Sequence, residues 1–283
     1  MRTVESVATP SPSPTAASLP SPLTTTSNYL SVENLSKVYA TRNGPVRALD
    51  QVSLNLERGE FLSILGPSGC GKSTLLMIAA GLLPSSNGVI RVEGEPVSRP
   101  RTDIGIVFQS PVLLEWRTAL DNILLQAEAR SLDRGSATLR ARELLAAVGL
   151  AGFEDKYPQE LSGGMRQRVS ICRALIHNPP QLMMDEPFGA LDALTRDQLV
   201  LDIQRIWNEF RATVLFITHS VAEAVFLSDR VVVMTPRPGK IDRVVKIDLP
   251  RPRTLVMRDS PEFAFYSRQI LDCLLSRGVL REH

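Results

Sequence analysis

Residues 66–74 read GPSGCGKST and fit the pattern G-x-x-x-x-G-K-[ST]. They follow a short apolar run, Phe61–Leu65 (FLSIL), and precede a helical pattern over residues 72–80. Glycines in such a loop let backbone N–H groups turn toward phosphate oxygens, and the helix start adds a positive dipole. The stretch therefore predicts a nucleoside triphosphate site, and it leaves kinase, GTPase and ATPase open. The residues expected around the phosphates are Gly66, Pro67, Ser68, Gly69, Cys70, Gly71, Lys72, Ser73 and Thr74.

Composition excludes several other classes. The 32 basic and 30 acidic side chains leave a net charge of +2, without the basic excess of a nucleic-acid-binding protein. Three widely spaced cysteines offer neither a disulfide framework nor a zinc spacing and fit reduced thiols in a cytosol. The longest apolar stretches, such as residues 75–83, are about half of the ~20 residues of a membrane span. Any membrane pore must then belong to another chain.

Strand and helix patterns alternate along most of the chain. Amphipathic spacing in residues 140–148 and 198–210 predicts helices. Alternation of this kind implies an α/β fold with a mainly parallel sheet covered on both faces. Besides Phe61–Leu65, buried strands are predicted at residues 104–108 and 182–184, at Thr213–Thr218 and at Arg230–Met234.

The chain is expected to have three parts. Residues 1–28 are rich in Pro, Ser and Thr and predict a disordered tail. Residues 29–235 form the main domain, in which mostly helical patterns at about residues 110–176 predict an inserted subdomain. Residues 236–283 predict a short C-terminal extension, Pro- and Arg-rich at first and ending in a helix near residues 263–275.

Two further segments narrow the choice of activity. Asp185 and Glu186 end an apolar strand, where the first acid can hold Mg²⁺ through water and the second can activate water. A solvated loop entry is the alternative for this pair. Residues 161–168 (LSGGMRQR) open a helical run, and Ser162 with its two glycines predicts a second anion-binding helix start. The alternative here is an ordinary serine N-cap.

Together with the loop at residues 66–74, LSGGMRQR resembles the signature of the ATP-binding cassette (ABC) family. The resemblance extends from about Tyr29 to Arg253. It implies a P-loop NTPase fold of the ABC type, with a RecA-like core, an antiparallel β subdomain and an inserted helical subdomain. Met165 replaces the commoner glutamine of the signature, and Gln181 takes an apolar position, where it is expected to shorten the following strand.

The family pattern implies a role for each matching residue. Lys72 contacts the β- and γ-phosphates, and Tyr39 stacks on adenine. Glu186 is the general base and His219 contacts the γ-phosphate, so the implied catalytic residues are Glu186, His219, Lys72 and Gln109. The implied Mg²⁺ ligands are Ser73, Gln109 and Asp185. The implied contacts of ATP with a second subunit are Ser162, Gly163, Gly164, Met165 and Asp192.

The resemblance also implies partners. Two cassettes face head to tail, most simply as a homodimer, with each ATP between the phosphate loop of one and Ser162–Gly164 of the other. The dimer sits on transmembrane permease subunits at the cytoplasmic side of the inner membrane, serves a solute-binding protein indirectly, and binds no nucleic acid. Residues 110–125 (SPVLLEWRTALDNILL) are expected to face the permease with Leu113, Leu114 and Trp116 exposed. Ordinary subdomain core is the alternative for these three.

Three phrases are similar to ATPases of the nitrate, sulfonate and taurine uptake group: residues 113–123 (LLEWRTALDNI), 229–241 (DRVVVMTPRPGKI) and 249–253 (LPRPR). An ATP hydrolase driving uptake of a small solute is therefore expected. The alternatives are the ATPase of an exporter and a cassette ATPase acting on nucleic acid. The sequence does not identify the transported solute. Because Cys70 lies at a helix start, a reactive thiolate protected by ATP is also predicted.

Overall fold

The structure is a computed structural model that describes residues 28–189 and 191–277. The predicted tail lies outside the described residues except for Asn28, where the first strand begins. The described strands are β1 (Asn28–Thr41), β2 (Gly44–Glu57), β3 (Phe61–Leu65), β4 (Asn87–Val92), β5 (Glu95–Pro96), β6 (Ile104–Val107), β7 (Gln181–Asp185), β8 (Thr213–Thr218), β9 (Arg230–Met234) and β10 (Ile241–Lys246). The described helices are α1 (Lys72–Ala79), α2 (Ala119–Ala129), α3 (Arg134–Ala147), η1 (Pro158–Glu160), α4 (Gly163–Leu175), α5 (Ala193–Phe210), α6 (Val221–Leu227), η2 (Leu255–Asp259) and α7 (Pro261–Ser276).

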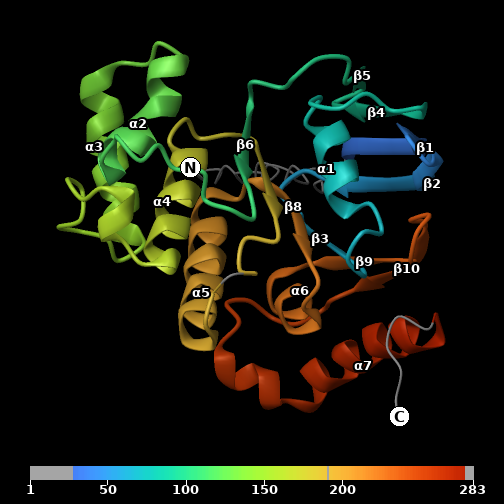
Figure 1. Cartoon of the computed structure of the whole chain (residues 1–283). Coiled ribbons are helices and arrows are strands. Elements are labelled where there is room, and N and C mark those ends of the chain that lie inside the picture. Colours follow the sequence, from blue (N-terminus) through green and yellow to red (C-terminus); the bar gives the residue numbers. More distant parts are fainter. Residues whose placement is uncertain (1–27, 190, 278–283) are drawn as a thin grey trace, which may run out of the picture.

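Six strands of the described chain form the central sheet, in the order β10-β9-β3-β8-β7-β6 (Figure 1). All pairs are parallel except β10 with β9, so the predicted mainly parallel sheet is confirmed. Every residue of β3 and β8 is buried, as expected for strands covered on both faces. Alternate residues of β3 point to opposite faces of the sheet. Phe61 and Leu65 pack against the helices α2 to α7, and Leu62 packs against α1 and the antiparallel sheet of β1, β2, β4 and β5.

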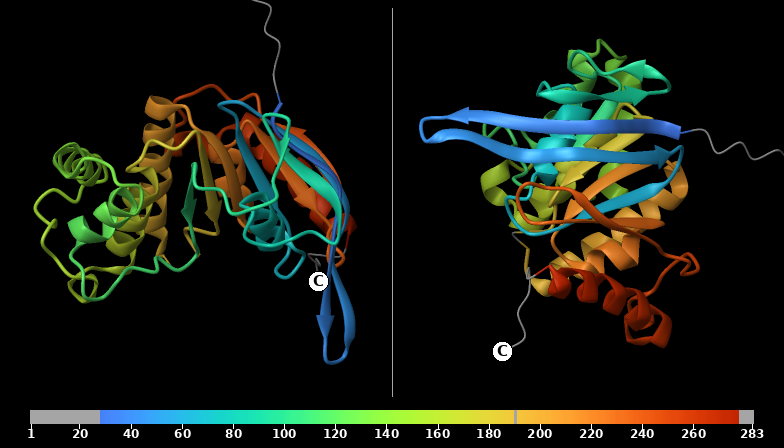
Figure 2. Two further views of the ribbon diagram at one scale, coloured as in Figure 1. Left: turned by 90° about the horizontal axis from the view of Figure 1, so that it is seen from above. Right: turned by 90° about the vertical axis from the view of Figure 1, so that its right-hand side faces the viewer.

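Two smaller units flank this sheet at opposite ends (Figures 1 and 2). One is an antiparallel sheet in the order β2-β1-β4-β5, dominated by a long β1–β2 hairpin. The other gathers α2, α3, η1 and α4, with Leu144, Leu145 and Val148 buried as their helical spacing predicted. The phosphate loop between β3 and α1 lies beside the antiparallel sheet, where Gly71 approaches Ala48 and Leu49 of β2.

The helix N-termini differ in whether a side chain caps their free backbone N–H groups, and an uncapped N-terminus can bind a ligand instead. Side chains cap α2 to α7 by accepting a hydrogen bond from a backbone N–H group in the first turn. Among the α-helices of the described chain, α1 alone has no side-chain cap, and its N-cap is Gly71. Its first N–H groups have no helical acceptor either. The capping residues of the other helices are Thr118, Asp133, Ser162, Asp192, Ser220 and Ser260.

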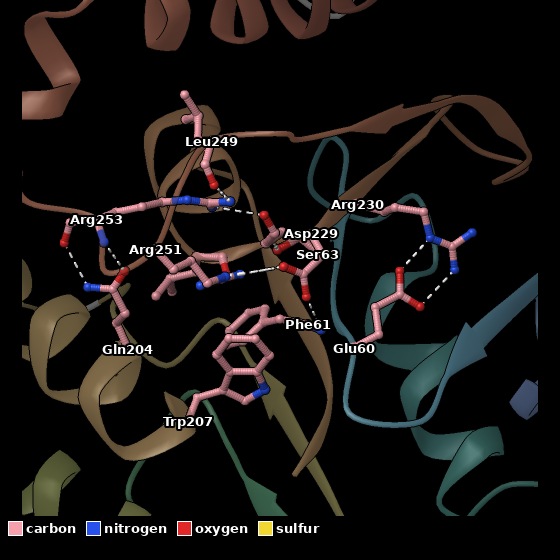
Figure 3. A network of polar contacts seen from close by, with 12 residues as sticks. Glu60, Phe61, Ser63, Gln204, Trp207, Asp229, Arg230, Leu249, Arg251 and Arg253 are labelled. Carbon is pink, nitrogen blue, oxygen red and sulfur yellow. Dashed lines mark hydrogen bonds and ion pairs between the residues drawn. The ribbon is translucent and has the colours of Figure 1, made fainter. Parts of the chain in front are cut away.

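The segment predicted as a C-terminal extension is joined to the core sheet, because β10 pairs with β9 and α7 packs into the helical core. A buried arginine fixes the segment between them (Figure 3). Arg253 is 2% exposed and donates to the carbonyls of Val225, Phe226 and Ser228 at the end of α6. Its backbone exchanges hydrogen bonds with the amide of Gln204 on α5. Burial lowers the pKa of Arg253 to about 10, so it stays charged at neutral pH.

Arg251 anchors the same segment to the central sheet (Figure 3). Its Nη2 donates to Asp229 Oδ1 at 2.8 Å, and its guanidinium carbon lies 4.2 Å from the ring centroid of Trp207. The other oxygen of Asp229 accepts from the backbone N–H of Phe61 at 2.9 Å. The start of β3 and the residues after β10 are thus held by one carboxylate.

Two smaller findings complete the fold. Gln181 does not shorten its strand as predicted: β7 begins at Gln181, which is fully buried and accepts a hydrogen bond from Arg101. That guanidinium satisfies the amide oxygen, whereas the amide nitrogen has no hydrogen-bond partner within the described residues. No helix within the described ranges is both long and apolar enough to span a bilayer.

Candidate nucleotide site

The loop between β3 and α1 folds around the side chain of Lys72. Its Nζ donates to the carbonyls of Gly66 at 2.9 Å and Pro67 at 3.1 Å, and the residue is only 4% exposed. Gly69 and Gly71 have φ angles of +74° and +107°, in the region that favours glycine. A Cβ on Gly71 would also lie 2.7 Å from Leu49 Cδ2. The glycine spacing of the loop therefore meets both a backbone and a packing requirement.

Two carboxylates face this loop from the end of β7. Ser73 Oγ donates to Asp185 Oδ1 at 3.0 Å. Glu186 Oε1 lies 3.4 Å from Lys72 Nζ, and Glu186 Oε2 lies 3.1 Å from His219 Nδ1 at the end of β8. Burial raises the pKa of Asp185, and the hydrogen bond from Ser73 opposes that rise. The side chains of Ser73, Asp185, Glu186, Lys72 and His219 therefore lie together at the carboxyl ends of the neighbouring strands β3, β8 and β7.

Glu186 is held in an uncommon conformation. Its φ angle is +45°, and its backbone N–H donates to the carbonyl of Ile217 on β8 at 2.9 Å. A residue other than glycine in this region stores about 1–3 kcal/mol of strain and is often found where a side chain must be aimed. Here the conformation directs the carboxylate toward Lys72 and His219.

A cleft of about 370 Å³ runs along the loop. Tyr39 and Gln109, two of the residues implied for the site, line it, and the Tyr39 hydroxyl lies 3.2 Å from Thr74 Oγ1. Three lining residues had no predicted role: Val46 and Ala48 of β2, and Arg237 of the β9–β10 turn. The phrase around Arg237 had stood out in the sequence, but only the fold brings it to the loop. The complete lining is Tyr39, Val46, Ala48, Ser68, Gly69, Gly71, Lys72, Ser73, Thr74, Gln109, Glu186 and Arg237.

The segment at the start of α4 does not line this cleft. Ser162 Oγ caps the helix by accepting from Met165 N at 3.3 Å, and both Ser162 and Gly163 are exposed. Gly164 is buried, and a Cβ there would collide with Thr195 Cγ2 at the start of α5. That helix is capped by Asp192, which accepts from Thr195 N at 3.0 Å. The hydrogen bond from the Thr195 backbone lowers the pKa of Asp192.

The described chain therefore holds two separate groups of predicted residues. One surrounds the phosphate loop, and the other lies at the adjacent starts of α4 and α5. Each group contains a helix N-terminus, the position where backbone N–H groups bind anions.

The predicted reactive thiolate at Cys70 is wrong. The side chain is 1% exposed, and burial raises the pKa of its thiol. The helix start favours an anion on its cleft side, but this sulfur points into the core between the two sheets. Among the residues expected to face a permease, Trp116 is 74% exposed. Leu113 and Leu114 were expected to be exposed but are half-buried, and Leu113 packs on the helical core.

Known proteins are similar to this chain in sequence. A family profile described as ABC transporter matches residues 49–189. The bicarbonate transport ATP-binding protein CmpD of Synechocystis sp. is 44% identical over 257 residues, covering 89% of this chain and 91% of the relative. The taurine import ATP-binding protein TauB of Rhizobium johnstonii is 45% identical over 260 residues, covering 89% and 98%.

Among solved structures, a dimeric ATP-binding cassette in a post-hydrolysis state with ADP and Pi superposes with a TM-score of 0.70. It is 32% identical and covers 78% of this chain and all of that one. The fold and the loop define a P-loop nucleotide-binding ATPase. With the identity to its relatives, they show that this chain belongs to the ABC transporter family as an ATP-binding cassette.

Proposed function

We propose that this chain is the ATP-hydrolysing subunit of an importer, in which ATP-driven closure of two cassettes is coupled to uptake of a small solute. One observation supports the proposal that the chain hydrolyses ATP. Glu186 follows β7 and faces the phosphate-binding loop across the cleft, between Lys72, 3.4 Å away, and His219, 3.1 Å away. The importer part is supported by relatives named for bicarbonate transport and taurine import.

The cleft residues fit the parts of ATP. Tyr39 offers an aromatic face for adenine at the rim, and the uncapped start of α1 offers backbone N–H groups to the phosphates. Lys72 supplies the matching charge. Ser73 Oγ and Asp185 Oδ1 lie 3.0 Å apart and are hard oxygen donors, so with Gln109 they fit Mg²⁺, which takes few protein ligands beside phosphate. Bound Mg²⁺ would neutralise charge on the phosphates during transfer.

Glu186 is the proposed general base. In this structure its carboxylate is paired with Lys72, and bound phosphates would compete for that lysine and free the carboxylate to orient a water. His219 is 56% exposed at its side chain and contacts the other carboxylate oxygen, where it would fix the orientation of Glu186 and reach the γ-phosphate. The two residues directly follow the neighbouring strands β7 and β8, so the sheet itself sets their spacing.

A second copy completes the proposed site. The exposed Ser162 and Gly163, with Met165 and Asp192, stand at the starts of α4 and α5, outside the cleft. The similar cassette that holds ADP and Pi is a dimer. We infer a head-to-tail pair in which this group meets the nucleotide of the other copy, so that ATP favours the closed state by binding both halves.

A permease is the proposed membrane partner, at the inner face of the membrane. Trp116 is exposed, and Val112 and Leu114, which precede it in the chain, line a groove of about 420 Å³ between the helical unit and β6. A groove of this kind suits a short helix of another chain. The groove is lined by Arg101, Ile104, Gly105, Ile106, Phe108, Val112, Leu114, Leu125, Gln126, Arg130, Arg173, Ala174 and His177. A solute-binding protein would act through the permease only.

The decisive experiment changes Glu186→Gln and measures ATP hydrolysis together with the oligomeric state. The variant should hydrolyse ATP about 100-fold or more slowly, the effect of losing a general base, and should accumulate as an ATP-bound dimer. Glu209→Gln makes the same change on α5, outside the cleft lining, and should behave as wild type. Normal turnover by Glu186→Gln would refute the proposed base.

Coupling is tested by Trp116→Ala in the chain co-expressed with its permease. The variant should keep the hydrolysis rate of the isolated chain but lose solute-stimulated hydrolysis in the assembled transporter. Leu139→Ala removes a similarly exposed side chain, 67% accessible on α3, as a control. A coupled transporter containing Trp116→Ala would rule out this docking surface.

A further inference from the structure

The turn between β9 and β10, residues 235–240, packs directly against the phosphate loop. A Cβ on Gly239 would collide with the carbonyl oxygen of Cys70, so only glycine permits this approach. The backbone of Gly239 donates to the carbonyl of Ala48 at 2.9 Å, which ties the turn to β2 as well. The turn is therefore a second wall of the nucleotide cleft.

Arg237 projects from this wall to the lip of the cleft. Its Nε donates to the carbonyl of Gly69 at 3.1 Å, and it lines the cleft together with Lys72 and Tyr39. The residue is exposed, and no carboxylate among the described residues forms an ion pair with it. Its two terminal nitrogens form no hydrogen bond within the described part of the chain, so four N–H donors remain.

The acids of the cleft do not supply the missing counter-charge. Asp185 accepts from Ser73, and Glu186 is shared by Lys72 and His219. Two arginines that follow β10 are anchored: Arg251 pairs with Asp229, and Arg253 is buried on backbone carbonyls. A guanidinium fixed by one backbone contact and open on its other side is well suited to a phosphate, which it binds with two parallel hydrogen bonds.

We propose that Arg237 is a second cationic ligand of the nucleotide, binding its phosphate chain in addition to Lys72. The inference rests on the proposed function, because it takes the occupant of the cleft to be ATP. It adds a residue from the turn after β9 to a site otherwise built by the β3–α1 loop and the ends of β7 and β8.

The test measures equilibrium binding of ATP and ADP by calorimetry, with Mg²⁺ chelated so that hydrolysis does not interfere. Arg237→Ala and Arg237→Gln should both weaken binding by about tenfold, the size of a partly exposed charge-assisted hydrogen bond, and Arg237→Lys should recover part of it. The loss should shrink as salt is raised. Arg243→Ala removes the same charge from an exposed position on β10 and should bind as wild type.

Three outcomes would overturn the inference. Arg237→Ala could bind nucleotide as Arg243→Ala does. Arg237→Gln could retain full affinity, which would make the residue a spacer for the loop. Unchanged nucleotide affinity with weakened ATP-dependent dimerisation would assign Arg237 to the second copy. Failure of the wild-type chain to bind ATP would refute the proposed function instead, so the two failures are distinguishable.

Discussion

The starts of α1 and α4 are both glycine-rich, and they are built for different situations. The start of α1 has no side-chain cap, encloses Lys72 and lines a cleft with Glu186. The start of α4 is capped by its own Ser162 and is open at Gly163, where an added Cβ would meet nothing within 4 Å. The start of α1 therefore has a lysine and two carboxylates beside it, whereas the start of α4 is an exposed surface of backbone groups.

This difference explains why the two motifs carry unequal information in a single chain. A phosphate site needs N–H donors and a cation, and the start of α1 has both in place. The α4 start has donors only. Under the proposed dimer, the second surface gains its role when another copy presents a nucleotide to it, so each motif is tested by a different measurement.

The largest expected effect comes from a substitution that disables the phosphate site at the start of α1. Lys72→Ala should reduce ATP hydrolysis by about 100-fold or more and weaken ATP binding, because it removes the buried charge facing Glu186. Hydrolysis assays and calorimetry give the two values. Lys246→Ala, which removes an exposed lysine on β10, is the matched control. If Lys72→Ala bound ATP as tightly as the wild type, the nucleotide could not be bound at this loop as proposed.

A substitution at Gly163 should disable the surface at the start of α4 and leave the phosphate site at the start of α1 intact. Because nothing lies within 4 Å of an added Cβ, Gly163→Glu should fold with an unchanged melting temperature and bind ATP as an isolated chain. Its negative charge should repel the nucleotide of a second copy, so that ATP-dependent dimerisation fails and hydrolysis falls by about tenfold or more. Light scattering with ATP measures the dimer. Gly163→Ala should be nearly neutral, and full activity of Gly163→Glu would contradict the two-copy site.

The neighbouring glycine separates packing from binding. Gly164→Ala should destabilise the chain by about 1–3 kcal/mol, because the new methyl group collides with Thr195 Cγ2. Thermal unfolding measures the loss. Thr195→Ser removes that methyl group while keeping a hydroxyl, so the double variant should regain most of the stability. Independent, additive losses from the two changes would mean that this contact is not the cause.

The smallest expected effect concerns Cys70. Burial raises the pKa of this thiol, so the thiolate fraction at neutral pH falls and grows only as pH rises past the ordinary thiol value. Iodoacetamide should therefore modify native Cys70 slowly, with little protection by ATP, as read by mass spectrometry. Cys172, with a pKa raised to about 12 and no exposed surface, is the internal reference. Rapid alkylation that ATP blocks would restore the prediction made from sequence.

Sequence reasoning did best where neighbouring residues decide the structure. The run from Phe61 into the glycine loop, the strand ending at Asp185 and the helix begun by Ser162 all follow from local periodicity and capping, and the structure contains each element. Their proposed chemical roles stay predictions, because no ligand contact tests them.

Sequence reasoning failed where distant segments meet. Nothing local to Arg237 or Ala48 shows that the β9–β10 turn and β2 close over the phosphate loop. The burial of Cys70 depends in the same way on a sheet formed by residues from both sides of it. Tertiary contacts override local preference at both places. The strand β10 was missed for a different reason: it pairs with its neighbour β9 in a hairpin, but of its six residues only Val245 is buried, so no apolar run marks it in the sequence.

The buried Arg253 has a consequence for the order in which the protein is made. Synthesis proceeds from the N-terminus, so β3 and the phosphate loop emerge before β8 and β9, the two strands between which β3 lies. The carbonyls that end α6 then wait for residue 253 to be added. A ribosome stalled just after Met234 would carry every residue proposed to contact ATP except Arg237, but the carbonyls at the end of α6 would still lack the guanidinium of Arg253. The helix that follows His219 would therefore gain its last buried contacts only late in synthesis.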